Sequence, residues 1–193
     1  MLLADPWFPR VTTLTRRPLA TDDPKLERIV LDFETLFTAP PPFAADVIIC
    51  ALGTTIKQAG SQERFRRVDL EYPLAIARLG VERGASHFLL VSALGANARS
   101  RIFYSRVKGE LEDAVLALPY PAVTILRPSW LFGDRREPRL GEEIGRRIAF
   151  LVPRKYRAVP ARAVAKALVE AAGEGGHRRR IIESAELHDG GAR

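Results

Sequence analysis

The chain has 193 residues, of which 47% are hydrophobic, and it carries a formal net charge of +7. This length and apolar content suit one globular domain over residues 1–193, with no surplus for a second core. The only cysteine, Cys50, excludes a disulfide framework, and no segment is long and apolar enough to predict a membrane span. Because a lone cysteine fits a reducing compartment, we expect a cytoplasmic protein, and because the chain begins without a basic flank or apolar leader, we expect a soluble one.

The positive charge would suit a nucleic acid if the arginines were clustered. They are scattered, and the tightest run, Arg178-Arg179-Arg180, has neither interleaved aromatic residues nor a recognised binding motif around it. The sequence therefore favours a solvated, arginine-rich surface over nucleic-acid binding.

The first half of the chain predicts three strands. Residues 11–15 form a short β-rich run, residues 29–32 form a second, and a proline-rich spacer leads to the strongly apolar run at 47–52. The last of these has the composition of a central strand that is covered on both faces.

Helices and strands alternate from there on. Apolar residues recur at helical spacing over 68–83, Gly84 provides a C-terminal stop, and Pro73 fits only in the first turn or at a kink. The later predicted elements are strands at 88–92, 122–126 and 181–182 and helices at 105–118, 141–150 and 162–172. This alternation predicts an α/β fold, a doubly wound parallel sheet of the Rossmann type, and makes a helical bundle or an all-β sandwich improbable.

Three residues could form a catalytic group. Tyr104 and Lys108 stand four apart, so on a helix their side chains share one face, and the ammonium would lower the pKa of the phenol. The pair alone is weak evidence, but Ser92 ends an apolar strand twelve residues before Tyr104, where its hydroxyl could hold a substrate oxygen. The alternative is that Tyr104 packs on the sheet, Lys108 extends to solvent and Ser92 only ends a strand.

Other residues suit a dinucleotide. Gly53 follows the strand at 47–52, where its backbone could approach a flat ligand, although an ordinary turn is equally compatible. Arg16 and Arg17 follow the first strand, which has no acid at its end to hold a ribose hydroxyl, so they favour the 2′-phosphate of NADP(H) over NAD(H). They could equally be solvated loop charges. Asp32 could contact the adenine side or cap a turn.

Two residue types have no predicted role in chemistry. Cys50 lies in a buried apolar run, which raises a thiol's pKa and argues against a nucleophile. The three histidines show no metal-ligand spacing, so we expect no metal.

Together these segments resemble the atypical short-chain dehydrogenase/reductases, and within them the small NAD(P)H-binding branch of the Tat-interacting oxidoreductase-like proteins. The resemblance runs through residues 11–18, 46–55, 67–72, 87–96, 104–110 and 126–135. It implies that Tyr104 is the general acid, that Lys108 lowers its pKa and holds the nicotinamide ribose, and that Ser92 anchors the substrate oxygen.

The resemblance also implies a cofactor path. Arg16 and Arg17 would meet the adenosine phosphate, Leu52, Gly53 and Thr54 would line the cofactor, and Pro128 would pass near the nicotinamide. NADP(H) is the expected cofactor and NAD(H) stays open. The substrate would be a small carbonyl or alcohol compound, and the helix at 105–118 could serve a homodimer face, although such stripes more often pack on the sheet.

The chain departs from this family at its start. The family opens with a strand and a Gly-x-x-Gly-x-x-Gly turn, whereas the first glycine here is Gly53. We therefore expect an N-terminally truncated domain, with Met1 an internal methionine or a misassigned start. The absent strand would lie at the sheet's centre, between the strands at 11–15 and 47–52.

The loss of that strand should be costly. Burying about five apolar side chains at about 2 kcal/mol each contributes on the order of 10 kcal/mol, so the chain should fold poorly alone. It should also bind dinucleotide weakly, because the turn normally holds the pyrophosphate.

The favoured function is an NADP-preferring oxidoreductase that reduces a carbonyl compound. The alternative is a non-catalytic dinucleotide-sensing or protein-interaction module on the same scaffold. A third hypothesis is that this chain is a truncated product without activity.

Overall fold

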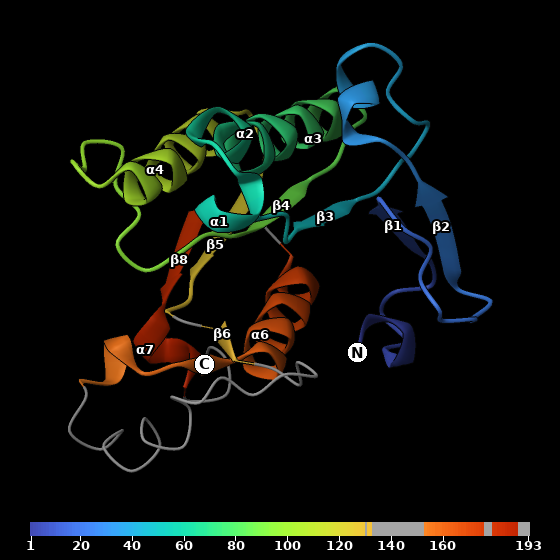
Figure 1. Cartoon of the computed structure of the whole chain (residues 1–193). Helices are drawn as coiled ribbons and strands as arrows, with labels where there is room; N and C mark the ends of the chain where they lie inside the picture. The colour runs from blue at the N-terminus through green and yellow to red at the C-terminus, as the bar shows by residue number, and fades with distance from the viewer. Residues whose placement is uncertain (130, 133–152, 176–178, 189–193) are drawn as a thin grey trace.

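The computed structural model describes residues 1–129, 131–132, 153–175 and 179–188, in which strands and helices alternate (Figure 1). The helix expected at 141–150 lies outside the described residues. The strands are β1 Val11–Thr15, β2 Leu26–Val30, β3 Val47–Cys50, β4 His87–Val91, β5 Ala122–Arg127, β6 Leu131–Phe132, β7 Val159–Pro160 and β8 Arg179–Glu183. The helices and helical turns are η1 Leu2–Ala4, η2 Phe33–Phe37, α1 Ile56–Ala59, α2 Gln62–Arg66, η3 Arg67–Glu71, α3 Tyr72–Glu82, α4 Phe103–Leu116, η4 Arg154–Tyr156, α6 Ala161–Glu174 and α7 Ser184–Leu187.

The main sheet has four strands in the order β3-β4-β5-β8, and every pair is parallel. β1 and β2 form a separate parallel pair, and β6 pairs with β7. β4 and β5 are buried along nearly their whole length, which explains their continuous apolar sequences. The predicted α/β fold with a parallel sheet is confirmed.

Helices cover both faces of the main sheet. α2, α3 and α4 lie over one face and α6 lies over the other (Figure 1). Successive residues of β4 serve the two layers, because Phe88 and Leu90 belong to the core under α3 and α4, whereas Leu89 packs into the core with α6.

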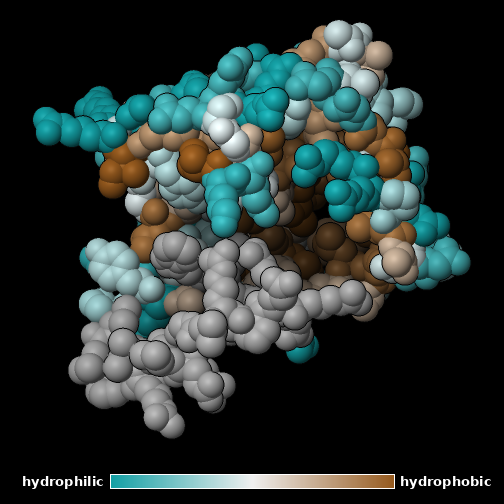
Figure 2. All heavy atoms as spheres, viewed as in Figure 1, coloured by the Kyte–Doolittle hydropathy of each residue, from teal (hydrophilic) through white to brown (hydrophobic). Residues whose placement is uncertain are grey.

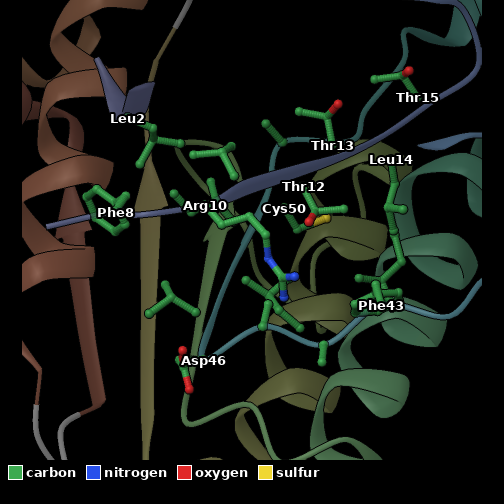
Figure 3. A pocket seen from close by; sticks show the side chains of 18 of the residues that line it. Leu2, Phe8, Arg10, Thr12, Thr13, Leu14, Thr15, Phe43, Asp46 and Cys50 are labelled. Carbon is green, nitrogen blue, oxygen red and sulfur yellow. The ribbon is translucent and has the colours of Figure 1, made fainter. Parts of the chain in front are cut away.

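The described part of the sheet is split where the absent strand was expected. β1 has only β2 as a neighbour and β3 has only β4, so one edge of each is unpaired within the described residues. A cavity of about 670 Å³ lies between them and is lined by residues of both strands. Figure 2 shows a hydrophobic hollow there, and Figure 3 shows the Arg10 side chain pointing into it. Within the described residues, no strand fills the position between β1 and β3 where the central strand of such a fold was expected.

Two strands end earlier than the sequence predicted. The strand expected at 29–32 is β2, which ends at Val30, because the Asp32 carboxylate accepts a hydrogen bond from the Glu34 N–H (3.1 Å) and caps η2. β3 likewise ends at Cys50, so Leu52 lies in the loop after it.

The helix expected at 68–83 belongs to a longer helical run, because α2, η3 and α3 follow one another from Gln62 to Glu82. Pro73 stands in the first turn of α3, immediately after the π-helical turn η3. Since proline has no N–H, it cannot bond the Asp69 carbonyl as a regular α-helix requires, which gives a physical reason for the irregular turn at that point. Gly84 ends this run with a positive φ of 80°.

Candidate active site

Three loops meet at the carboxyl edge of the main sheet. Gly53 and Thr54 follow β3, Ser92 follows β4 and Pro128 follows β5, and because these strands are parallel their ends lie at the same edge. The Leu94 N–H donates to the Pro128 carbonyl over 2.8 Å, which ties the last two loops together. Sheets of this kind bind ligands at that edge.

Helix α4 brings Tyr104 and Lys108 to the site. The Lys108 side chain is buried, with the residue only 4% exposed, whereas Tyr104 is 38% exposed and packs its ring on Phe65 with centroids 5.6 Å apart. This is the reverse of the structural alternative, in which the lysine extends to solvent. A long cation held inside a helix–sheet interface needs a specific partner.

That partner is Asp69, which the sequence analysis did not single out. The Lys108 Nζ lies 2.8 Å from Asp69 Oδ1, and both side chains are almost fully buried. Asp69 Oδ2 accepts a hydrogen bond from the Thr54 N–H at 2.8 Å. The sequence shows only that Asp69 is an acid within a helical pattern, four residues before Pro73. This position does not identify Lys108 as its partner.

Gly53 packs closely against this ion pair. A Cβ at Gly53 would lie 3.3 Å from Asp69 Oδ1 and 3.7 Å from the Lys108 Nζ. Because glycine has no side chain, the loop can pack directly against the charged pair. This packing gives a third interpretation of the glycine, beside close approach to a flat ligand and an ordinary turn.

The net change in the Tyr104 pKa is a rise, because burial outweighs Lys108, which acts to lower the pKa as expected. Loss of solvation raises the pKa of Tyr104 above 10; Lys108 opposes this, and Asp69 adds to it. Burial also raises the pKa of Asp69, against the lowering effect of Lys108. Asp69, which pairs with the lysine, thus opposes part of the effect of Lys108 on the phenol.

Ser92 places a hydroxyl at the same edge. The residue is 6% exposed, its N–H donates to the Leu126 carbonyl over 2.8 Å, and its Oγ has no hydrogen-bond partner among the described residues. A buried hydroxyl without a partner costs free energy, so it is a candidate for bonding a ligand oxygen.

The structure does not bring Arg16, Arg17 and Asp32 into this group. Both arginines are exposed beyond the end of β1, which lies across the cavity from Leu52. Asp32 caps η2, in agreement with one of its two predicted roles.

The Cys50 side chain is buried in the structure. Burial raises the pKa of the Cys50 thiol to about 11, as expected for a side chain that packs rather than reacts. Among the described residues there is no group of histidine, cysteine or acidic side chains that could hold a metal ion. The same residues contain no helix with the length and apolar character needed to cross a membrane.

No protein-family model matches the chain. Among curated proteins, Protein HTATIP2 of Rattus norvegicus is 36% identical over 175 residues, covering 87% of this chain and 72% of the relative. The chain belongs to the HTATIP2 family. Protein FMP52, mitochondrial, of Candida albicans is 35% identical over 151 residues (75% of this chain, 66% of the relative), and that of Debaryomyces hansenii is 34% identical over 179 residues (86% and 77%).

The HTATIP2-like chain is an atypical short-chain dehydrogenase/reductase, as the sequence motifs predicted. It spans 72% of the length of HTATIP2 and 60% to 66% of the length of three FMP52 relatives. The expected cytoplasmic location is wrong, because several relatives are named as mitochondrial proteins.

Solved structures show the same fold. MoeE5 in complex with UDP-glucose and NAD matches with a TM-score of 0.65 at 14% identity, covering 89% of the HTATIP2-like chain and 66% of MoeE5. The human epimerase family protein SDR39U1 with NADPH matches with a TM-score of 0.57 at 15% identity, covering 89% and 64%.

Proposed function

We propose that this protein is an NAD(P)(H)-dependent oxidoreductase that acts on a small carbonyl or alcohol compound, with NADP(H) preferred. One observation carries the proposal: an exposed phenol, Tyr104, stands one helical turn from a buried lysine, Lys108, at the strand edge that carries Ser92. Relatives of the fold solved with NAD or NADPH support a nicotinamide cofactor.

Each residue has one role in this proposal. The Ser92 hydroxyl, which has no partner among the described residues, would donate a hydrogen bond to the substrate oxygen and orient it toward the Tyr104 phenol. Tyr104 would then exchange a proton with that oxygen. Lys108 would hold the nicotinamide ribose near the loop of Gly53 and Thr54.

The residues present fit a dinucleotide in part. Gly53 leaves its backbone uncovered next to the Lys108 Nζ, and Pro128 lies in the neighbouring loop. Arg16 and Arg17, exposed beyond β1, would meet the 2′-phosphate. When bound, a nicotinamide dinucleotide supplies or accepts the hydride.

The state of the phenol favours carbonyl reduction. Because the pKa of Tyr104 is raised above its ordinary value of 10, the side chain is protonated near neutral pH. A protonated phenol can donate to the developing alkoxide of a reduced carbonyl, whereas alcohol oxidation needs the phenolate as a base.

One observation favours the second candidate, a non-catalytic dinucleotide-sensing or protein-interaction module. The cavity lies between β1 of the separate pair and β3, the edge strand of the main sheet, where a complete dinucleotide-binding fold would have its first strand and pyrophosphate turn. A chain with weak cofactor binding could retain the scaffold as a surface for partners.

Tyr104→Phe separates the two candidates. NADPH consumption would be followed with a panel of small aldehydes and ketones, with Tyr156→Phe, another exposed tyrosine, as the matched control. The oxidoreductase proposal expects turnover to fall by about 10²–10⁴-fold in Tyr104→Phe only. Equal turnover in the two variants, or none with any compound in the wild type, would favour the non-catalytic module.

A further inference from the structure

The ion pair between Asp69 and Lys108 joins three separate parts of the site. Asp69 lies in η3, Lys108 in α4, and the Thr54 N–H that donates to Asp69 Oδ2 lies in the loop after β3. The carboxylate therefore uses one oxygen for the lysine and the other for the loop. A substitution that removed it would release both contacts together.

Stability alone is a poor explanation for this pair. Replacing a buried ion pair by uncharged side chains of similar size is often neutral or stabilising, because both charges must be stripped of water. A buried pair at the ligand-binding edge of a sheet, one helical turn from an exposed phenol, is better placed to control the electrostatics of that phenol.

We propose that Asp69 is a positioning residue of this site: it holds the Lys108 ammonium against the Gly53–Thr54 loop and cancels most of its charge, so that the Tyr104 phenol is a weaker acid than it would be beside an unpaired lysine. This inference deepens the proposed function and rests on it. It assigns the acid, and not the lysine alone, to the control of the phenol's acidity.

The groups that face this carboxylate are consistent with the inference. Lys108 and Tyr104 approach from α4, and the buried Cys50 thiol lies on β3, where both members of the pair affect its pKa. The thiol is neutral near pH 7 because its pKa is raised to about 11. Lys108 is thus the one cation among these groups, and Asp69 is the group that can offset it.

The test is a spectroscopic titration of Tyr104, which needs no cofactor and no turnover. Tyrosinate absorbance would be followed against pH in each protein and in the same protein carrying Tyr104→Phe, and the difference isolates Tyr104 from the other tyrosines. In Asp69→Asn, which keeps the size and one oxygen, we expect the pKa of Tyr104 to fall by about one unit, because the lysine is no longer offset. An unchanged pKa in the folded variant would overturn the inference.

A double variant covers the case in which Asp69→Asn does not fold. Asp69→Asn with Lys108→Met removes both charges, and the inference expects the Tyr104 pKa to match the wild type. If Asp69 were only structural and Lys108 acted on the phenol unopposed, the same variant would raise that pKa, which would refute the proposal. Glu112→Gln, at a buried acid that pairs with Arg127 over 2.5 Å, is the matched control and should leave Tyr104 unchanged.

The titration separates this inference from the proposed function. A shifted Tyr104 pKa without any NADPH consumption would support the role of Asp69 and argue against the oxidoreductase. NADPH consumption that depends on Tyr104 but an unshifted pKa would keep the enzyme and remove the role of Asp69.

Discussion

Gly109→Ala should move α4, the helix that carries Tyr104 and Lys108. A Cβ at Gly109 would lie 2.6 Å from the Asn97 Cα and still closer to the Asn97 carbonyl carbon and the Ala98 nitrogen. These are backbone atoms, so no rotamer change can relieve the clash. The loop is also fixed to the helix, since the Asn97 N–H donates to the Ser105 carbonyl at 2.9 Å.

Two opposing effects set the size of the change. Alanine is better than glycine inside a helix by about 1 kcal/mol, whereas overpacking costs about 1–3 kcal/mol and more when backbone must shift. Because backbone atoms must move, the cost of overpacking should be about 3 kcal/mol. After the gain in helix preference is subtracted, we expect Gly109→Ala to lower the free energy of unfolding by about 2 kcal/mol. For a domain of this size that lowers the melting temperature by about 4–8 °C.

Gly173→Ala is the matched control on α6. A Cβ there would meet only Trp7 Cδ1, at 4.0 Å, so the helix preference acts alone and stability should rise by up to about 1 kcal/mol. Both variants would be measured by thermal unfolding followed by circular dichroism. Equal or higher stability in Gly109→Ala would refute the claim that the loop and α4 are in direct backbone contact.

Three further predictions concern single side chains. Ser92→Ala should raise the free energy of unfolding by about 1 kcal/mol, since it removes a buried hydroxyl without a described partner, while turnover falls; a stability loss in denaturant titration would show that the hydroxyl is bonded. Cys50, with its pKa raised to about 11 and its side chain buried, should react with thiol reagents only after denaturation, and rapid labelling of the folded protein would contradict this. Hydrogen bonds from Arg67 and then Tyr72 lower the pKa of Glu34 from 4.5 to about 2, so its stabilising effect is present above pH 4.5 and is lost as the pH falls toward about 2. Glu34→Gln should therefore be less stable than the wild type at neutral pH, with a difference that disappears over that range in denaturant titrations; a constant difference would argue against the pairing.

Much of the fold could be predicted from the sequence because the signals are local and repetitive. Apolar runs such as 47–52 and 88–92 identify buried parallel strands, and the βαβ order then fixes their neighbours. Even the split between β1 and β3 in the described residues was expected from the family resemblance, because the family's glycine-rich turn has no counterpart before Gly53. The errors lie at the ends of strands, because a single side-chain contact can determine where a strand ends. Asp32, which caps η2 soon after the end of β2, is an example.

The site was harder because its electrostatics depend on contacts between distant segments. The spacing of Tyr104 and Lys108 indicates a shared helix face, but it cannot show that Asp69, thirty-nine residues before Lys108, takes the lysine's charge. Burial of the phenol, which raises its pKa and outweighs the effect of Lys108, could not be read from the spacing either, and Asp69 adds to that rise. No local pattern in the sequence identifies a partner across two helices.

A fluorescence titration with NADPH and NADH tests directly whether this fold binds a nicotinamide dinucleotide. Three proteins would be compared. The first is this chain, and the second is an extended chain in which an apolar strand and a glycine-rich turn precede Met1. The third is the extended chain with Arg16→Ala and Arg17→Ala. We expect saturable binding by the extended chain, weaker binding by the chain alone, and a preference for NADPH that disappears in the arginine variant. No saturable binding of either nucleotide by any of the three would contradict the claim that this is a nicotinamide-dinucleotide site.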